Sequence, residues 1–124
     1  SFTISALAMS EDFIRESPNA ACAIMMSILR GQEYVRDEAN FDEVVQLVAK
    51  WNDQPVELVE ATFPDYPFDP TIDENYVRDQ TEYTTFLFDA GRISEQIDPM
   101  EYTYTGFLEM YNPDYVVVEG GWQP

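Results

Sequence analysis

The chain contains no histidine and a single cysteine, Cys22, and these absences remove most familiar catalytic systems. Without histidine, neither a Ser-His-Asp nor a Cys-His nucleophilic system can form within the chain. One cysteine makes neither a disulfide nor a multi-cysteine zinc site, and its alanine neighbours predict a small buried thiol. Glycine is also scarce, and the only pair, Gly120–Gly121, predicts a loose C-terminal end, not a phosphate-binding loop. We therefore predict that the chain is not an enzyme and uses no cofactor.

Basic residues are few as well. Six Lys and Arg face 24 Asp and Glu, which gives a net charge of −18. Nucleic acid binding requires a basic patch, so we exclude nucleic acid as a partner, and an anionic membrane surface is disfavoured for the same reason. No apolar run approaches the roughly 20 residues that span a bilayer. The acidity predicts a solvated surface that keeps the protein soluble, with a cation or metal buffer as the less favoured reading.

A group of carboxylates between residues 65 and 74 predicts a helix-capping connector and no metal site. Asp65, Asp69, Asp73 and Glu74 lie close in sequence. A calcium loop of the EF-hand type needs Asp or Asn at alternate positions and glycine at the sixth. Starting from Asp65, the third and sixth positions are both proline, so that reading fails.

The order of caps, apolar faces and prolines predicts a mainly α chain with one or two short strands. Ser10 caps a short helix, Pro18 opens a long one, and Pro55 opens another. The expected helices are 10–16, 18–36, 41–51 capped by Asn40, 55–63, 73–91 and 98–111, and the expected strands are Thr3–Met9 and Tyr115–Glu119. We expect one domain over residues 1–124, with residues 113–124 as a C-terminal tail.

Apolar positions at helical spacing predict the core. In the long helix they are Ala21, Ile24, Met25, Ile28, Leu29 and Val35, and in the next two they are Phe41, Val44, Val45, Val48, Trp51, Val56, Val59 and Phe63. The aromatic residues between Tyr66 and Phe107 could be interpreted as a ligand site. Core packing is the commoner role of aromatics on helical faces, so we predict that they pack in the core.

In this order and spacing the segments resemble the C-terminal part of one family of ABC-importer solute-binding proteins, of the nitrate/sulfonate/taurine and thiamine-pyrimidine type. Ser10-Glu-Asp-Phe-Ile14 resembles a helix start after a strand that returns from the second lobe, and Ser17-Pro18-Asn19 a proline break. Leu87-Phe-Asp-Ala-Gly-Arg-Ile93 resembles a glycine-ended helix, and Tyr104-Thr-Gly-Phe-Leu108 the closing helix. The resemblance covers roughly residues 4–108.

The resemblance implies a fragment of a two-lobed α/β periplasmic-binding-protein fold (type II), in an extracytoplasmic receptor two to three times this long. Such receptors close over a small solute and dock on the importer's membrane subunits. Their ligand contacts come largely from strand-end loops upstream of this segment, so no ligand-binding residue is implied here. Cut from its sheet, the segment is expected to self-associate as a homodimer. A free-standing acidic helical interaction domain, without ligand or catalysis, is the alternative.

Overall fold

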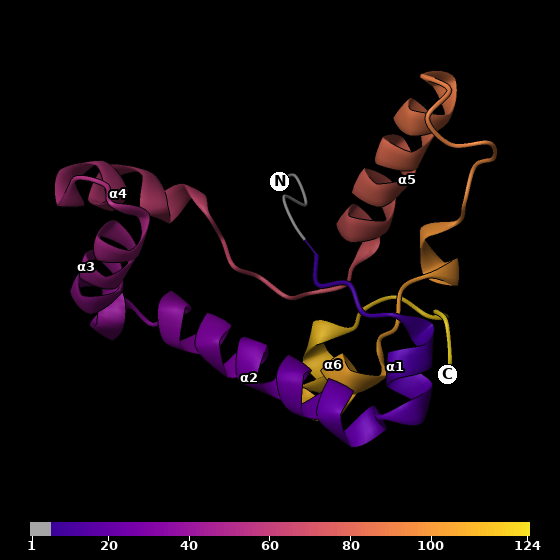
Figure 1. Ribbon diagram of the computed structural model, residues 1–124, viewed down its shortest axis with the longest axis horizontal. Coiled ribbons are helices and arrows are strands. Elements are labelled where there is room, and N and C mark those ends of the chain that lie inside the picture. Colours follow the sequence, from indigo (N-terminus) through magenta and orange to yellow (C-terminus); the bar gives the residue numbers. More distant parts are fainter. Residues whose placement is uncertain (1–5) are drawn as a thin grey trace. The chain divides into compact units, whose positions relative to one another are not determined.

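Helices make up 66% of the computed structural model, which describes residues 6–124, and those residues form no sheet (Figure 1). The prediction of a mainly α chain is confirmed. The longer helices are α1 (Glu11–Glu16), α2 (Pro18–Arg36), α3 (Phe41–Asn52), α4 (Val56–Thr62), α5 (Glu74–Asp89) and α6 (Gly106–Tyr111). Short 3-10 turns are η1 (Glu38–Asn40), η2 (Phe63–Asp65), η3 (Pro99–Glu101) and η4 (Pro113–Tyr115).

Most helix boundaries follow from the caps that the sequence predicts. The Ser10 hydroxyl accepts from the Phe13 N–H at 3.2 Å, and Asp73 begins α5 in the same way. After α5, Gly91 adopts φ +65, the Arg92 N–H donates to the Leu87 carbonyl and the Gly91 N–H to that of Phe88. That pair of bonds is a Schellman ending, which requires a left-handed residue and explains the glycine.

One predicted cap works differently from expectation. Asn40 occupies the position before α3 but makes no side-chain cap bond there. Its side-chain amide donates instead to the Tyr34 carbonyl at the end of α2, at 3.0 Å. Asp37 supplies the local cap, since its carboxylate accepts from the Ala39 N–H and starts η1.

The last predicted helix, 98–111, is wrong as a continuous element. The structure divides it into η3 and α6, separated by residues 102–105. The Thr103 hydroxyl donates to the Pro99 carbonyl at 2.8 Å, and threonine bonds of this kind compete with the helical ladder. Gly106, a poor helix former, then begins a new helix.

Neither predicted strand forms in the described residues. Ala6–Met9 has no regular structure, and the start of the Thr3–Met9 strand lies outside the described residues. The Tyr115–Glu119 strand is wrong, since only an isolated parallel bridge joins Val116 to Ile72. The pairing stops there because Tyr115 closes the turn η4 and Asp73 already caps α5.

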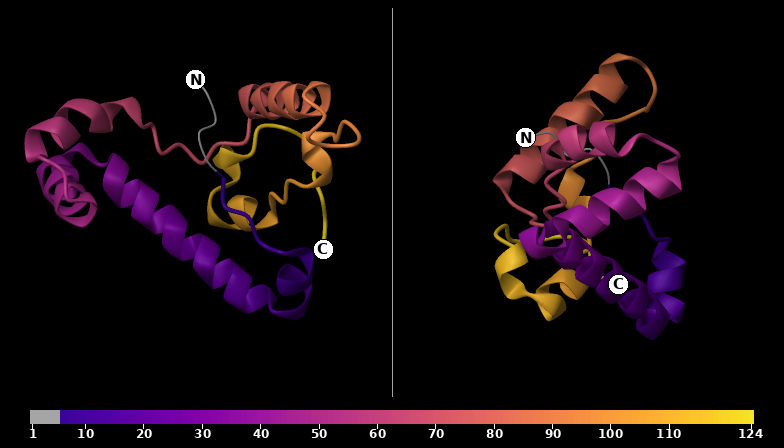
Figure 2. Two further views of the ribbon diagram at one scale, coloured as in Figure 1. Left: turned by 45° about the horizontal axis from the view of Figure 1, so that its top comes forward. Right: turned by 90° about the vertical axis from the view of Figure 1, so that its left-hand side faces the viewer.

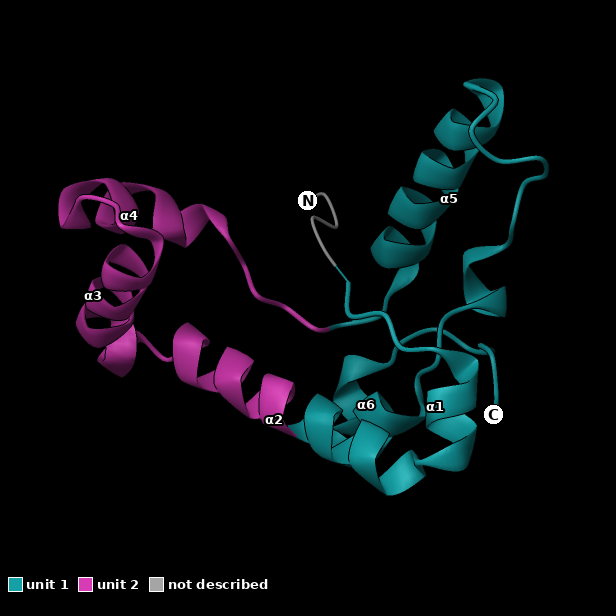
Figure 3. Ribbon diagram, viewed as in Figure 1, with its two compact units in different colours: residues 1–26, 71–124 teal, residues 27–70 magenta. Residues whose placement is uncertain are grey.

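The chain divides into two compact units, residues 27–70 and residues 1–26 with 71–124 (Figure 3). In the first of these, α3 and α4 pack side by side around Val45, Ala49 and Val59 (Figure 2). In the other, Ile14, Ala21 and Phe107 form the buried cluster, with Trp122 packed against it. Helix α2 passes from one unit into the other between Met26 and Ser27.

The predicted core of α2 is broader than the buried one. Ala21 and Leu29 are buried, with 0% and 2% of their surface exposed. Ile24 and Ile28 remain 43% and 37% exposed, so their assignment to the core is wrong. Positions 21, 25 and 29 share one side of the helix, whereas 24 and 28 lie at the edge of that side, where cover ends.

The prediction for α3 holds except at its end. Val44 and Val45 are buried, and Phe41 and Val48 pack against the α3–α4 cluster. Trp51, predicted to share that face, is 90% exposed. It lies in the last turn of α3, beyond the residues that pack against α4.

Candidate functional site

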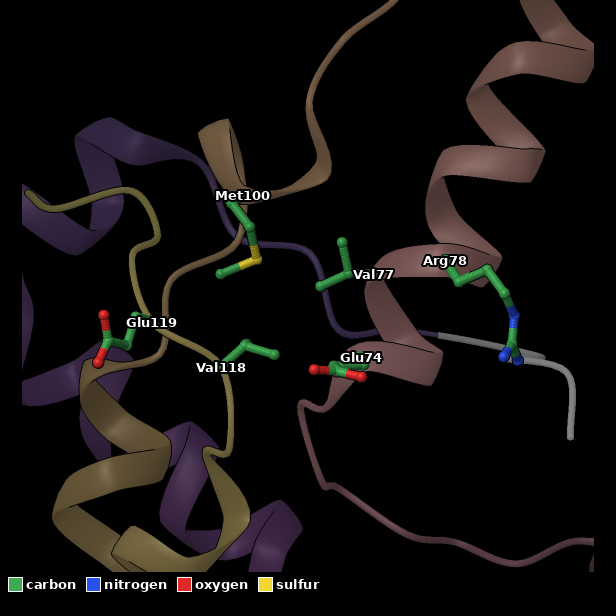
Figure 4. A pocket seen from close by; sticks show the side chains of 6 residues that line it. All are labelled: Glu74, Val77, Arg78, Met100, Val118 and Glu119. Carbon is green, nitrogen blue, oxygen red and sulfur yellow. The ribbon is translucent and has the colours of Figure 1, made fainter.

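A hollow of about 370 Å³ lies where α5, η3 and the C-terminal tail meet (Figure 4). All three segments belong to the same compact unit. The residues that line it are Glu74, Val77, Arg78, Met100, Val118 and Glu119. No sequence pattern predicted this hollow, because its three walls lie far apart along the chain.

The first wall is the N-terminal turn of α5, held in place by Asp73. Its carboxylate accepts from the Tyr76 N–H at 2.9 Å and from the Asn75 side-chain amide at 3.1 Å. These bonds lower the pKa of Asp73 below its ordinary value, and the bond from the Tyr76 N–H is the largest cause. The cap fixes the start of the helix and therefore the directions in which Glu74 and Val77 point.

The second wall, η3, is tied both to its own cap and to α5. The Asp98 carboxylate accepts from the Met100 N–H at 2.9 Å. The Tyr76 hydroxyl on α5 lies 3.0 Å from the Thr103 hydroxyl, which in turn donates to the Pro99 carbonyl. Burial, reinforced by Tyr76 and Asp98, raises the pKa of the neighbouring Tyr102.

The third wall is the tail, which is fastened on both sides of Val118. Before it, the Ile72 N–H donates to the Tyr115 carbonyl at 2.8 Å and the Val117 N–H to that of Ile72 at 2.9 Å. After it, the Trp122 N–H donates to the Thr103 carbonyl at 2.9 Å. The expectation of a loose C-terminal end is therefore wrong.

The side chain of Trp122 adds ring contacts to the hydrogen bond that its N–H makes. Its ring meets that of Tyr104 edge-on at 5.7 Å, and Tyr104 meets Phe107 in the same way at 4.9 Å. The Arg15 guanidinium lies 5.0 Å from the centre of the Trp122 ring, within cation–π range. Gly121 allows the approach, because a Cβ there would lie 2.8 Å from the Thr103 carbonyl oxygen.

The interior of the hollow is apolar with one carboxylate facing it. Val77, Met100 and Val118 are half-buried, and in Figure 4 the Glu74 carboxylate and the Val118 side chain point toward one another. The carboxylate of Glu119 and the guanidinium of Arg78 point away. Arg78 donates to Asn75 at 2.9 Å and pairs with Asp79 at 3.0 Å. The six lining residues include no nucleophile paired with a base.

Residues considered from sequence for other chemistry are not brought together. Across residues 6–124, no group of three or more Cys, Asp or Glu side chains is placed to hold a metal ion. Asp73 serves as a helix cap, as predicted. Cys22 is half-buried, not fully buried as expected, and lies 3.9 Å from the sulfur of Met110.

Several aromatics that were assigned to core packing are exposed. Of those between Tyr66 and Phe107, the exposed ones are Tyr66, Tyr83, Phe86, Phe88 and Tyr102. Phe107 is buried, and Tyr104 packs against the same cluster. The core-packing prediction is therefore wrong for the five exposed rings, three of which lie on α5 and two in the segments that follow η2 and η3.

A second hollow, of about 420 Å³, lies on α3 and is lined by Leu47, Val48, Lys50 and Trp51. All four residues come from the last turns of one helix, and Leu47 is 55% exposed. It is an apolar face with one cation, and among residues 6–124 no second segment lines it.

No family model, curated protein or solved structure matches the chain. Among the described residues, no helix is both long and apolar enough to cross a membrane.

Proposed function

We propose that this chain forms part of the extracytoplasmic solute receptor of an ABC importer. The parent receptor binds a small solute of the sulfonate, nitrate, taurine or thiamine-pyrimidine class and delivers it to the membrane subunits. In this proposal the chain is the C-terminal part of a two-lobed fold, and its helices brace one lobe.

The observation that carries the proposal is the order of helix starts and stops. The segment Ser10–Ile14 begins a helix, Pro18 begins the next, and a glycine at position 91 ends the long helix α5. Each of these local features coincides with a segment on which the resemblance rests. The match of order and spacing supports the proposal more than any single motif, because capped helices are common.

The exposed apolar side chains add independent support. Trp51, Phe86 and Leu47 are 90%, 66% and 55% exposed. Side chains of this size gain roughly 1.5–3 kcal/mol each when fully buried. A larger lobe that covers them would recover that free energy, which fits a segment of a bigger protein.

The alternative, a free-standing acidic helical interaction domain, also has an observation in its favour. Each compact unit has a hydrophobic cluster of its own, around Phe107 in one and Val59 in the other. The reading frame upstream of Ser1 separates the two proposals. About 180 residues or more of βα pattern after a signal peptide would support the receptor, and an immediate start codon would refute it.

Calorimetry provides the biochemical test. The complete gene product should bind one of the four solute classes with one-to-one stoichiometry, whereas the 124-residue chain should release no heat with any of them. The reason is that the proposal places the ligand contacts in upstream loops. One-to-one micromolar binding by the short chain alone would contradict the proposal.

A further inference from the structure

The hollow between α5, η3 and the tail has the lining of a small ligand-binding pocket, which the receptor proposal does not require. Its interior combines three half-buried apolar side chains, Val77, Met100 and Val118, with the carboxylate of Glu74. Its volume of about 370 Å³ falls within the range of small-molecule pockets. A ligand that fits must therefore present an apolar surface and a positive charge together.

Charge strengthens that assignment. The only cation in the lining, Arg78, is turned away and is engaged with Asn75 and Asp79, so it does not neutralise Glu74. The chain as a whole carries −18, which enriches cations and depletes anions at its surface. Anionic and neutral ligands are thus disfavoured relative to cations of the same shape.

The walls are also fixed before any ligand arrives. Asp73 caps α5, Asp98 caps η3, and hydrogen bonds hold the tail at Ile72 and at Thr103. A hollow whose three walls are each fastened loses little entropy on binding, which favours even a small ligand.

We infer that this hollow binds a small organic cation of the quaternary-ammonium type, whose alkyl groups contact Val77, Met100 and Val118 while its charge faces Glu74. The carboxylate is exposed, and an exposed ion pair contributes at most about a fivefold gain in affinity. We therefore expect a dissociation constant on the order of 1–10 mM.

Met100 supplies the readout, because its side chain lines the hollow. The full chain is labelled with carbon-13 at the methyl groups of its five methionines, and Met100→Leu identifies the Met100 signal. Tetramethylammonium chloride is titrated against this protein at constant ionic strength, with sodium chloride replaced as the organic cation is added. We expect a saturable shift of the Met100 methyl resonance, which equal amounts of tert-butanol, a neutral molecule of similar shape, fail to produce.

Two charge-matched variants locate the site. Glu74→Gln should weaken binding about fivefold, the full share of an exposed ion pair. Glu57→Gln removes the same charge from the first turn of α4, in the other compact unit, and should leave the affinity unchanged. Circular dichroism confirms that both variants fold.

Four results would overturn the inference: no saturation by about 50 mM, well above the expected constant; an equal response to tert-butanol; undiminished binding by Glu74→Gln; or equal losses in both variants. Equal losses would show that the overall field, not Glu74, attracts the cation. The result is distinguishable from that of the solute calorimetry, because the receptor proposal predicts silence of the short chain toward its solutes and makes no demand on this hollow.

Discussion

Two glycine-to-alanine substitutions should change stability in opposite directions. Gly31 lies within α2 and has no atom within 4 Å of the place where a Cβ would go. Gly121 has φ +111, and its Cβ would lie 2.8 Å from the Thr103 carbonyl oxygen. Both substitutions remove the same freedom from the unfolded chain, so that effect cancels in the comparison.

The magnitudes follow from the local geometry. Gly31→Ala should stabilise by about 0.5–1 kcal/mol, the usual difference between these residues inside a helix. Gly121→Ala should cost about 1–3 kcal/mol for the backbone conformation alone. The Thr103 oxygen cannot retreat freely, since it also accepts from the Trp122 N–H at 2.9 Å. Because the unfolded-chain effect cancels, the two variants should differ by at least about 1–3 kcal/mol, the backbone cost at Gly121.

Thermal melts followed by circular dichroism and by tryptophan fluorescence measure this difference. For a chain of this size, 1 kcal/mol corresponds to roughly 4 °C in Tm. If Gly121→Ala releases the tail without unfolding the unit, the Trp122 emission shifts to the red before the melt. A Gly121→Ala protein with the Tm and emission of the parent would refute the close approach of the tail to Thr103.

Four further predictions concern the core, the cap, the charge and self-association. Leu29→Ala should cost about 2–5 kcal/mol, while Ile28→Ala, at a 37% exposed site on the same helix, should cost clearly less; equal Tm losses would contradict that contrast. The Asp73 cap should contribute about 1 kcal/mol to the free energy of unfolding at neutral pH. Because the pKa of Asp73 in the folded chain lies below the ordinary 3.8, this contribution is present above pH 3.8 and is lost as the pH falls through the folded pKa. Melts of Asp73→Ala should lack the contribution at every pH. Tm should rise from about 20 mM to about 0.5 M sodium chloride, since screening relieves the repulsion of a −18 chain, and a flat profile would indicate locally paired charges. Light scattering behind a sizing column should show association at high concentration, diminished by Trp51→Glu; a constant mass of 14.3 kDa would contradict it.

The sequence was sufficient for the helices that local chemistry controls. Ser10, Pro18, Asp73 and Gly91 each mark a helix end where the structure has one, because capping depends on groups within a few residues. The predicted helix 98–111 failed for a local reason too, since the Thr103 hydroxyl bonds to the Pro99 carbonyl. The spacing of apolar residues, on which that prediction was based, does not indicate that a threonine hydroxyl competes for a backbone carbonyl.

The hollow and the tail could not be predicted, because both depend on long-range contacts. Nothing near Trp122 in the sequence indicates that its ring will meet Tyr104 and Arg15. Its neighbours Gly120 and Gly121 favoured a loose end, although their positive φ values are what bring the ring into place.

The same physical principle links the exposed rings to the proposed function. Spacing placed Trp51 on the apolar face of its helix, and packing within the described residues leaves it 90% exposed. Phe86 on α5 is 66% exposed, although aromatic residues on a helical face commonly pack in a core. Apolar patterning records the surfaces that a protein buries in its working state, because burial of each large side chain is worth roughly 1.5–3 kcal/mol. Where pattern and burial disagree on two separate helices, further protein that covers both is the simplest source of the missing contacts. The receptor proposal supplies that protein as the rest of a lobe, and it therefore requires the complete gene product to protect Trp51 from a soluble quencher that reaches it freely in the 124-residue chain.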